Sequence, residues 1–463
     1  MDNRVGNSIS EMTSGTKAVP VVSVTPAEFE SWLEGQPEEI RNWTRSTDFK
    51  GEAGTISLVA DGHGALSQVL FGIPEDPSLW DWACLPTKLP QGHYTLPEEI
   101  TAEIANRAVL GWMLAVYSFD RYKSPKPDGP VLCCPGVCDV VDVRRQAEAI
   151  CLARDLINTP ANDMGPEELA EQARLLAEAH GASCRMIVGD KLVKQNYPAI
   201  YAVGMASPRE PRLIDLRWGN ASDPKITLVG KGVCFDTGGL DLKPSSGMLM
   251  MKKDMGGAAH ALGAASMIMS AGLPVNLRVL IPAVENVVSG NAYKPMDVIQ
   301  TRKGLSIEIT NTDAEGRVIL SDVLYEASGE KPDLIVDFAT LTGAARIAMG
   351  TELPPFFCNN EDVAAELSAA AMRVADPLWR MPLWQGYKEA LDSNIADMCN
   401  SPGESFGGAI TAALFLERFV ENDTPWVHFD VMAWNRKATP GHPIGGEAST
   451  IRAVYDLVKN RCA

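Results

Sequence analysis

Apolar positions along the chain follow two spacings, and each spacing predicts a different kind of element. Alternating and β-branched residues predict strands, and apolar residues recurring at helical spacing predict helices. In the second half of the chain these patterns alternate, which favours a sheet with helices on both faces. The expected strands are residues 226–229, 277–281, 305–310 and 334–338, and the expected helices are residues 258–270 and 318–327.

The first third of the chain has shorter signals. Small and polar residues predict a loose tail over residues 1–20. Strands expected at residues 21–24 and 55–59 belong to a small α/β domain over residues 21–135. A helix is expected to start at Pro97, where a proline followed by acidic residues suits a first helical turn.

A long helix is expected over about residues 141–158, within a connecting segment over residues 136–160. The rest of the chain, residues 161–463, would form the catalytic domain. The predicted fold class is α/β: a small N-terminal α/β domain joined by the connector helix to a larger catalytic α/β domain, whose mixed, mostly central sheet is flanked by helices.

Composition narrows the possible functions. An apolar fraction of 46% and a charged fraction of 22% are usual for globular proteins. The formal net charge of −18 counts against nucleic acid or an anionic membrane as the main partner. We find no signal peptide and no run of about 18 uncharged apolar residues, and therefore expect a cytoplasmic protein without a membrane partner. The ten cysteines are scattered, which favours reduced, mostly structural thiols.

The most informative stretch is residues 311–317, between an expected strand and an expected helix. It places Asp313 and Glu315 at a helix start, where Arg317 adds hydrogen-bond donors. A capped helix start is the plain interpretation, because acidic residues favour first turns. Buried carboxylates are costly without a positive partner, however, and a metal ion is the strongest candidate for that partner.

Two further stretches carry matching chemistry. A glycine-rich segment after an expected strand places Asp236 between Lys231 and Lys243, and Asp254 comes just before an expected helix. Four carboxylates without a neighbouring histidine suit manganese, magnesium or zinc. Two ions are more natural than one for four acids, because one carboxylate can bridge two ions.

Taken together, these residues resemble the signature of the leucyl aminopeptidase family of dinuclear metallopeptidases. The similarity covers roughly the C-terminal two thirds of the chain, and the first domain resembles the family only loosely. The residues that carry it are Lys231, Asp236, Lys243, Asp254 and the stretch from Asn311 to Arg317.

The resemblance implies a role for each residue. Two divalent ions, manganese or zinc, would be bridged by Asp236 and Glu315, and a lysine ligand would have to be neutral. The metal ligands would be Lys231, Asp236, Asp254, Asp313 and Glu315. In catalysis, Lys243 would polarise the scissile carbonyl and Arg317 would hold a bicarbonate ion as general base. The substrate-binding residues would be Met251, Thr340, Leu341 and Gly343, although residues 340–343 also suit an ordinary strand-to-helix turn.

The resemblance therefore implies a cytosolic metallo-aminopeptidase that hydrolyses the N-terminal bond of peptide substrates, preferring apolar residues such as leucine, and that assembles as a homohexamer. A dipeptidase-like or cysteinylglycine-cleaving preference on the same machinery stays open. A nucleic-acid-binding or scaffolding role of the first domain is the alternative from another class, and the acidic charge counts against it. Serine and thiol peptidase chemistry has no support, because no Gly-x-Ser-x-Gly motif occurs.

Overall fold

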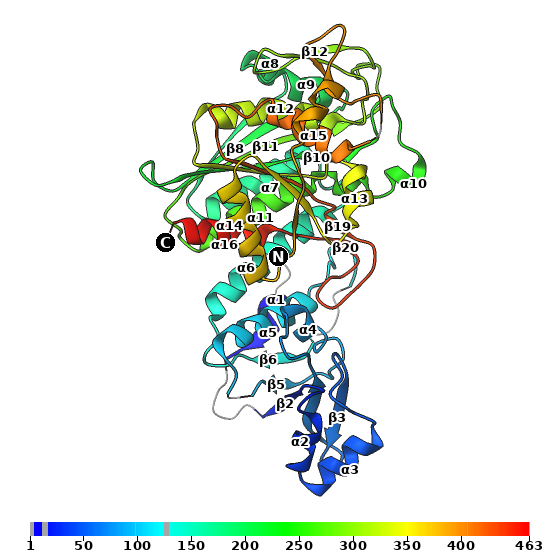
Figure 1. The fold of residues 1–463 in the computed structure, drawn as a ribbon, viewed down its shortest axis with the longest axis vertical. Coiled ribbons are helices and arrows are strands. Elements are labelled where there is room, and N and C mark those ends of the chain that lie inside the picture. The colour runs from blue at the N-terminus through cyan, green and yellow to red at the C-terminus, as the bar shows by residue number, and fades with distance from the viewer. Residues whose placement is uncertain (1–3, 12–16, 98, 125–128, 405, 463) are drawn as a thin grey trace. The chain divides into compact units, whose positions relative to one another are not determined.

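A computed structural model describes residues 4–11, 17–97, 99–124, 129–404 and 406–462 of the chain. It divides into two compact units, shown in Figure 1. Unit 1 comprises Met1–Cys151 and Arg436–Ile444, and unit 2 comprises Leu152–Asn435 and Gly445–Ala463. The boundary falls within the long helix α6 (Val140–Asn158), which matches the helix predicted over residues 141–158.

Unit 1 contains a six-stranded sheet in the order β1-β6-β5-β2-β4-β3, in which only β3 and β4 pair antiparallel. Phe29, Phe49 and Leu70 are at the centre of one of its apolar clusters. The strands are β1 (Ile9–Ser10), β2 (Ala18–Val24), β3 (Ile56–Ala60), β4 (Leu66–Gly72), β5 (His93–Thr95) and β6 (Val131–Cys133). The helices are α1 (Arg4–Asn7), α2 (Phe29–Glu34), α3 (Glu38–Ser46), α4 (Leu79–Trp82) and α5 (Ala102–Ala115).

Two predictions for unit 1 are wrong. The loose tail expected over residues 1–20 contains α1, β1 and the start of β2, because Val5 and Ile9 are buried and β1 pairs with β6. Residues 1–3 and 12–16 of that tail lie outside the described residues. The helix expected from Pro97 begins at Ala102, because the Thr101 side chain accepts a hydrogen bond from the Ile104 backbone N–H and caps it there. Glu98, part of that predicted start, also lies outside the described residues.

Unit 2 is built on a nine-stranded mixed sheet in the order β16-β15-β18-β14-β9-β11-β8-β7, with β10 paired to β11. Its centre is parallel: β18, β14, β9 and β11 run in one direction, whereas β8 is antiparallel to β11 and β15 is antiparallel to β18. The strands are β7 (Ser183–Val188), β8 (Arg212–Trp218), β9 (Lys225–Gly230), β10 (Gly232–Asp236), β11 (Asn276–Asn286), β14 (Leu334–Ala339), β15 (Pro355–Cys358), β16 (Trp379–Arg380) and β18 (Trp426–Asp430).

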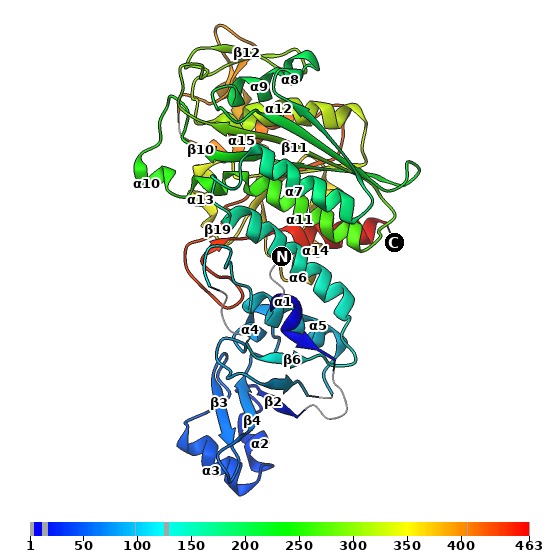
Figure 2. The same cartoon turned by 180° about the vertical axis from the view of Figure 1, so that it is seen from behind.

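Helices cover both faces of this sheet, as predicted from the alternating pattern. In Figures 1 and 2, α9, α12 and α15 lie on one face, and α7, α11, α14 and α16 lie on the other. Their bounds are α7 (Pro166–Ala179), α9 (Pro198–Gly204), α11 (Gly256–Ser270), α12 (Glu315–Gly329), α14 (Glu361–Arg373), α15 (Gly408–Glu417) and α16 (Ile451–Arg461). Shorter helices are α8 (Lys191–Lys194), α10 (Ser245–Met248), α13 (Gly343–Met349), η1 (Met251–Met255) and η2 (Gln385–Leu391).

The strand predicted over residues 305–310 differs from the prediction. It is shorter, as β13 (Ser306–Glu308), and it lies outside the central sheet in a three-stranded sheet with β12 (Val298–Gln300) and β17 (Met398–Cys399). It stops early because the next backbone N–H groups, of Thr310 and Asn311, donate to a side chain rather than to a strand. A two-stranded sheet of β19 (Trp434–Asn435) and β20 (Gly445–Gly446) completes unit 2.

Two further findings concern the composition. Within the described ranges, we find no helix with the length and apolar character that crossing a membrane requires. Cys134 and Cys138 carry free thiols, and burial raises the pKa of Cys134 to about 11 and that of Cys138 to about 12. Both thiols therefore stay protonated at neutral pH, as expected for structural cysteines.

Candidate metal centre

The acids and lysines singled out in the sequence come together in unit 2. Lys231 lies between β9 and β10, and Asp236 ends β10. Asp254 lies in η1, immediately before α11. Asp313 lies in the turn before α12, and Glu315 is the first residue of that helix. The site is therefore assembled from strand ends and helix starts, where side chains converge and backbone N–H groups are free.

Carboxylates form the centre of the site. Asp236, Asp313 and Glu315 each offer an oxygen within 4.8 Å of the others. Lys231 Nζ lies 2.7 Å from Asp254 Oδ2 and 2.8 Å from Glu315 Oε1, and its side chain is 3% exposed. Asp254, Glu315 and Lys231 are buried, so their charges must be balanced locally, because water screens them poorly.

Lys243 is the second cation of the cluster. Its Nζ lies 2.8 Å from Asp236 Oδ2 and also contacts Asp313 Oδ1. It belongs to the loop after β10, in which Gly238 and Gly239 adopt the positive φ values of 89° and 67°. These glycines let the backbone turn back, so that the Lys243 N–H donates to the Thr237 carbonyl at 2.9 Å.

The carboxylates retain capacity for a cation. Within the described part of the chain, Asp254 Oδ2, Asp313 Oδ1 and Glu315 Oε1 are buried oxygens that accept no hydrogen bond of ordinary geometry. Each touches a lysine Nζ only as an ion pair. Buried carboxylate oxygens normally take hydrogen bonds or coordinate metals. The donor set of hard oxygens plus a lysine nitrogen therefore fits divalent cations.

Burial and neighbouring charges shift the pKa values of the acids in different directions. Burial raises the pKa of Glu315 well above its usual range, and the negative charge of Asp236 adds to this effect. Burial and Asp236 also raise the pKa of Asp313, to about 6. The pKa of Asp254 is lowered, because Lys231 outweighs the effect of burial.

The pKa of Lys231 departs from what its burial alone predicts. Burial lowers it, but Asp254, Glu315 and Asp236 outweigh burial and hold it above its ordinary value. The pKa of Lys243 is raised for the same reason by Asp236 and Glu315. The acids alone therefore keep Lys231 protonated, and the neutral form that a metal ligand requires depends on the positive charge of the metal.

Thr312 joins the two acidic segments. Its buried hydroxyl donates to the Gly238 carbonyl at 2.6 Å and accepts from the Asp241 N–H at 2.8 Å, and its own N–H donates to Asp241 Oδ2 at 2.7 Å. Asn286 extends this link, because its Nδ2 lies 2.8 Å from Asp236 Oδ1 and 3.0 Å from the Thr312 carbonyl. Asp236 and the 311–317 turn are therefore held in one hydrogen-bonded frame.

Of the four predicted substrate-binding residues, Thr340 contacts the acid and lysine cluster directly. Thr340 follows β14; its hydroxyl is 2.7 Å from Asp254 Oδ1, and its carbonyl accepts from Lys231 Nζ at 3.0 Å. Met251 is buried in η1, Leu341 is half-buried, and Gly343 is exposed at the start of α13. Thr340 thus orients Asp254 and Lys231 directly, and the substrate-binding role of the four residues stays a prediction.

Arg317 is buried in the first turn of α12, and burial lowers its pKa to about 10. Its Nη1 donates to the Asn400 carbonyl at 2.7 Å. Among the described residues no carboxylate lies within ion-pair distance of this guanidinium. A buried guanidinium with donors to spare is suited to a small anion such as bicarbonate.

Sequence reasoning missed several residues that hold the site. Asn400 binds the 311–314 turn, Asn286 binds Asp236, and Asp430 accepts hydrogen bonds from Leu341 N, Thr342 N and the Thr342 hydroxyl. Lys253, which is 1% exposed, was also missed; burial lowers its pKa to about 8. Polar residues far apart in the chain give no local pattern, and only their fully buried positions identify them.

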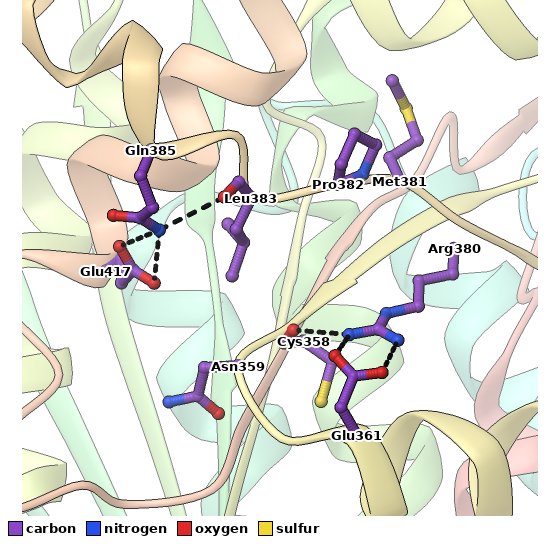
Figure 3. A pocket seen from close by; sticks show the side chains of 9 residues that line it. All are labelled: Cys358, Asn359, Glu361, Arg380, Met381, Pro382, Leu383, Gln385 and Glu417. Atoms are coloured by element: carbon purple, nitrogen blue, oxygen red, sulfur yellow. Dashed lines mark hydrogen bonds and ion pairs between the residues drawn. The ribbon is translucent and has the colours of Figure 1, made fainter.

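A separate pocket of about 550 Å³ lies at another part of unit 2 (Figure 3). Arg380 and Glu361 pair across it, and Gln385 donates to Glu417. None of the predicted site residues lines it. Its polar groups bind one another, so the metal centre and not this pocket carries the predicted chemistry.

Family models match both parts of the chain. The catalytic domain of the cytosol aminopeptidase family matches residues 151–455, and the N-terminal domain of the M17 aminopeptidases matches residues 19–135. Together with the buried acid and lysine cluster, these matches define a metal-dependent aminopeptidase. The chain belongs to the cytosol aminopeptidase family, which confirms the family resemblance seen in the sequence.

Individual relatives agree with this placement. A probable cytosol aminopeptidase of Syntrophotalea carbinolica is 43% identical over 369 residues, which cover 76% of this chain and 74% of the relative. A crystal structure of cytosol aminopeptidase from Coxiella burnetii superimposes with a TM-score of 0.95 at 47% identity, covering 98% of this chain and 99% of the other. The bottromycin maturation enzyme BotP in complex with Mn gives a TM-score of 0.86 at 32% identity, covering 96% and 99%.

Proposed function

We propose that this aminopeptidase releases N-terminal amino acids from peptides, prefers apolar residues such as leucine, and works with two divalent ions, manganese or zinc. The observation that carries the proposal is the convergence of three buried carboxylate oxygens, on Asp254, Asp313 and Glu315, that are paired with lysine Nζ atoms alone. The related enzyme BotP in complex with Mn supports manganese. The ligands would be Lys231, Asp236, Asp254, Asp313 and Glu315.

Each part of the proposed site would have its own role in peptide hydrolysis. A pair of divalent ions supplies an activated water and polarises the peptide carbonyl. Lys243, whose raised pKa keeps it cationic, would donate to the carbonyl oxygen as negative charge develops on it. Arg317 would hold a bicarbonate ion, a group that would supply a general base beside the site. Met251, Thr340, Leu341 and Gly343 would contact the first residue of the substrate.

The test is a kinetic screen of aminoacyl-anilides after treatment with EDTA and re-addition of manganese, zinc or cobalt. We expect activity to vanish with EDTA, to return with metal and to be highest on leucine-type substrates. D236N should lose about 100-fold or more of kcat/KM, because Asp236 is proposed to bridge both ions. Full activity of D236N, or of the metal-free protein, would refute the two-metal proposal.

The second candidate is a preference for cysteinylglycine or other dipeptides, cleaved at the same site. Including these dipeptides in the same screen distinguishes it from the leucine preference. Highest kcat/KM on cysteinylglycine would replace the leucine preference and leave the metal proposal intact. For the assembly we propose a homohexamer that acts in the cytoplasm. Sedimentation equilibrium of the full chain measures its mass directly, and a monomeric mass would exclude the hexamer.

A further inference from the structure

We propose that Asn400 is a positioning residue that sets the geometry of both Asp313 and Arg317. This inference rests on the proposed metal centre and goes beyond its ligands. Asn400 lies 87 residues beyond Asp313 in the chain, directly after β17 (Met398–Cys399), and is 0% exposed. It is neither charged nor part of a recognisable motif, yet it contacts the whole turn that carries Asp313.

The side-chain amide of Asn400 binds backbone N–H and C=O groups of the turn, as a neighbouring strand would. Its Oδ1 accepts from the Thr310 N–H at 2.9 Å and from the Asn311 N–H at 3.2 Å. Its Nδ2 donates to the Asn311 carbonyl at 2.7 Å and lies 3.4 Å from the Ala314 carbonyl. The Thr310 and Asn311 N–H groups lie where β13 has ended and α12 has not begun, and the Asn400 side chain supplies their acceptor.

The main chain of Asn400 fixes the other residue. Its N–H donates to the Glu308 carbonyl at 2.9 Å, which anchors Asn400 to β13. Its carbonyl accepts from Arg317 Nη1 at 2.7 Å. The position of the Arg317 guanidinium therefore depends on the same residue that shapes the 310–314 turn.

The proposed ligands differ in how much they depend on Asn400. Asp236 ends β10, where it pairs with Asn286 of β11, and Glu315 belongs to the first turn of α12, so each is part of a regular element. Asp313 lies in the turn, half-buried, with its N–H bonded to Asn311 Oδ1 at 2.8 Å. Loss of the Asn400 amide is therefore expected to disturb the metal position that uses Asp313 and to leave the one held by Lys231, Asp254 and Glu315.

The experiment compares N400A with two control variants in the full chain. Asn359 has the same bonding pattern, accepting from Trp426 N at 2.8 Å and donating to the Thr424 carbonyl at 3.0 Å, but is more exposed. Asp376 is buried and accepts from the N–H groups of Thr450 and Arg452. N359A therefore controls for the loss of an asparagine that binds backbone groups. D376A controls for the loss of a buried side chain that binds backbone groups.

The main readout is Mn²⁺ binding to metal-free protein by titration calorimetry, with the melting temperature measured in parallel. We expect all three variants to melt below wild type. Only N400A should weaken one of the two Mn²⁺ sites, by about 10- to 100-fold, as is usual when the partner of a ligand is removed. In steady-state assays at saturating manganese, kcat of N400A should fall further than KM changes, because the main-chain carbonyl that holds Arg317 loses the anchoring supplied by the Asn400 side chain.

A second variant keeps the inference testable if N400A does not fold. N400D has nearly the same volume and retains the acceptor oxygen, but it turns an oxygen instead of N–H groups toward the carbonyls of Asn311 and Ala314. We expect N400D to fold and to weaken the same single site. Unchanged binding at both sites in N400A or N400D, or an equal loss in D376A, would overturn the proposal. Absence of Mn²⁺ binding in wild type would instead overturn the proposed function.

Discussion

At the residue scale, the clearest constraint is the close approach of Gly316 to Lys231. A Cβ added at Gly316 would lie 2.6 Å from Lys231 Cε and 2.9 Å from its Nζ. Glycine in the first turn of α12 costs helix stability relative to alanine, by about 1 kcal/mol. Its presence there is explained by the lysine side chain, which passes over the helix to reach Asp254 and Glu315.

This contact gives a test that separates function from folding. In G316A the added Cβ meets the Lys231 side chain and not the backbone, so we expect the protein to fold, with a lower melting temperature because the ion pairs of Lys231 are disturbed. Lys231 must shift, and Mn²⁺ affinity should fall about 10- to 100-fold. The matched control is G329A, in the last turn of the same helix, where an added Cβ meets nothing within 4 Å. Equal Mn²⁺ affinity in G316A, G329A and wild type would contradict the role given to Lys231.

The sequence was most informative about charged residues and least informative about amides. Asp313 and Glu315 could be found because two acids at a helix start need a positive partner. Asn286 and Asn400 could not, because asparagine is common in turns and its partners are backbone groups of distant segments. The substrate-binding residues stay predictions for a related reason: a pocket wall is defined by shape rather than by charge.

At the element scale, helices were predicted better than strand partners. The apolar spacing of residues 318–327 lies inside α12, because a helix is determined by contacts within one segment. The strand before it was predicted too long and as part of the main sheet, whereas β13 pairs with β12 and β17. Strand pairing depends on residues far away in the chain, and one segment does not reveal it.

The pairing of β14 with β18 buries a titrating pair. His428 and Asp337 are register partners on these parallel strands, and His428 Nδ1 lies 2.6 Å from Asp337 Oδ1. Both are 0% exposed, and Trp426 Nε1 donates to the other Asp337 oxygen at 2.6 Å. Burial lowers the pKa of His428, but Asp337 outweighs burial, with help from Asp430, and the pKa lies above its ordinary value.

A raised folded-state pKa fixes the sign of the pH dependence. The unfolded histidine titrates near pH 6.5, so the stabilisation by the His428–Asp337 pair is complete below about pH 6.5 and is lost as pH rises through the folded-state value. We expect the difference in unfolding free energy between wild type and H428N, from urea titrations at pH 6 to 9, to shrink as pH rises. The exposed His63 provides the control, since H63N should show no such trend. A difference that grew with pH would contradict the assignment.

At the scale of the whole molecule, the proposed metal ligands all belong to unit 2. Every proposed metal ligand lies between Lys231 and Glu315, within Leu152–Asn435. Unit 1 has its own sheet and its own apolar cluster around Phe29 and Phe49. The boundary between the units lies within α6, and the short segment Arg436–Ile444 also belongs to unit 1.

This division predicts where metal binding stabilises the protein. A ligand that binds only the folded state adds about 2.7 kcal/mol at 100 times its dissociation constant, which slows amide exchange by roughly 100-fold wherever exchange requires unfolding of the binding unit. Hydrogen exchange of the full chain with and without Mn²⁺ should therefore show slower exchange in β9, β10 and α12, and unchanged exchange in β2 and β4. D236N should show neither change. Equal slowing in both units would mean that they unfold as one cooperative body, and slowing confined to unit 1 would place the metal outside the centre formed by Lys231, Asp236 and Glu315.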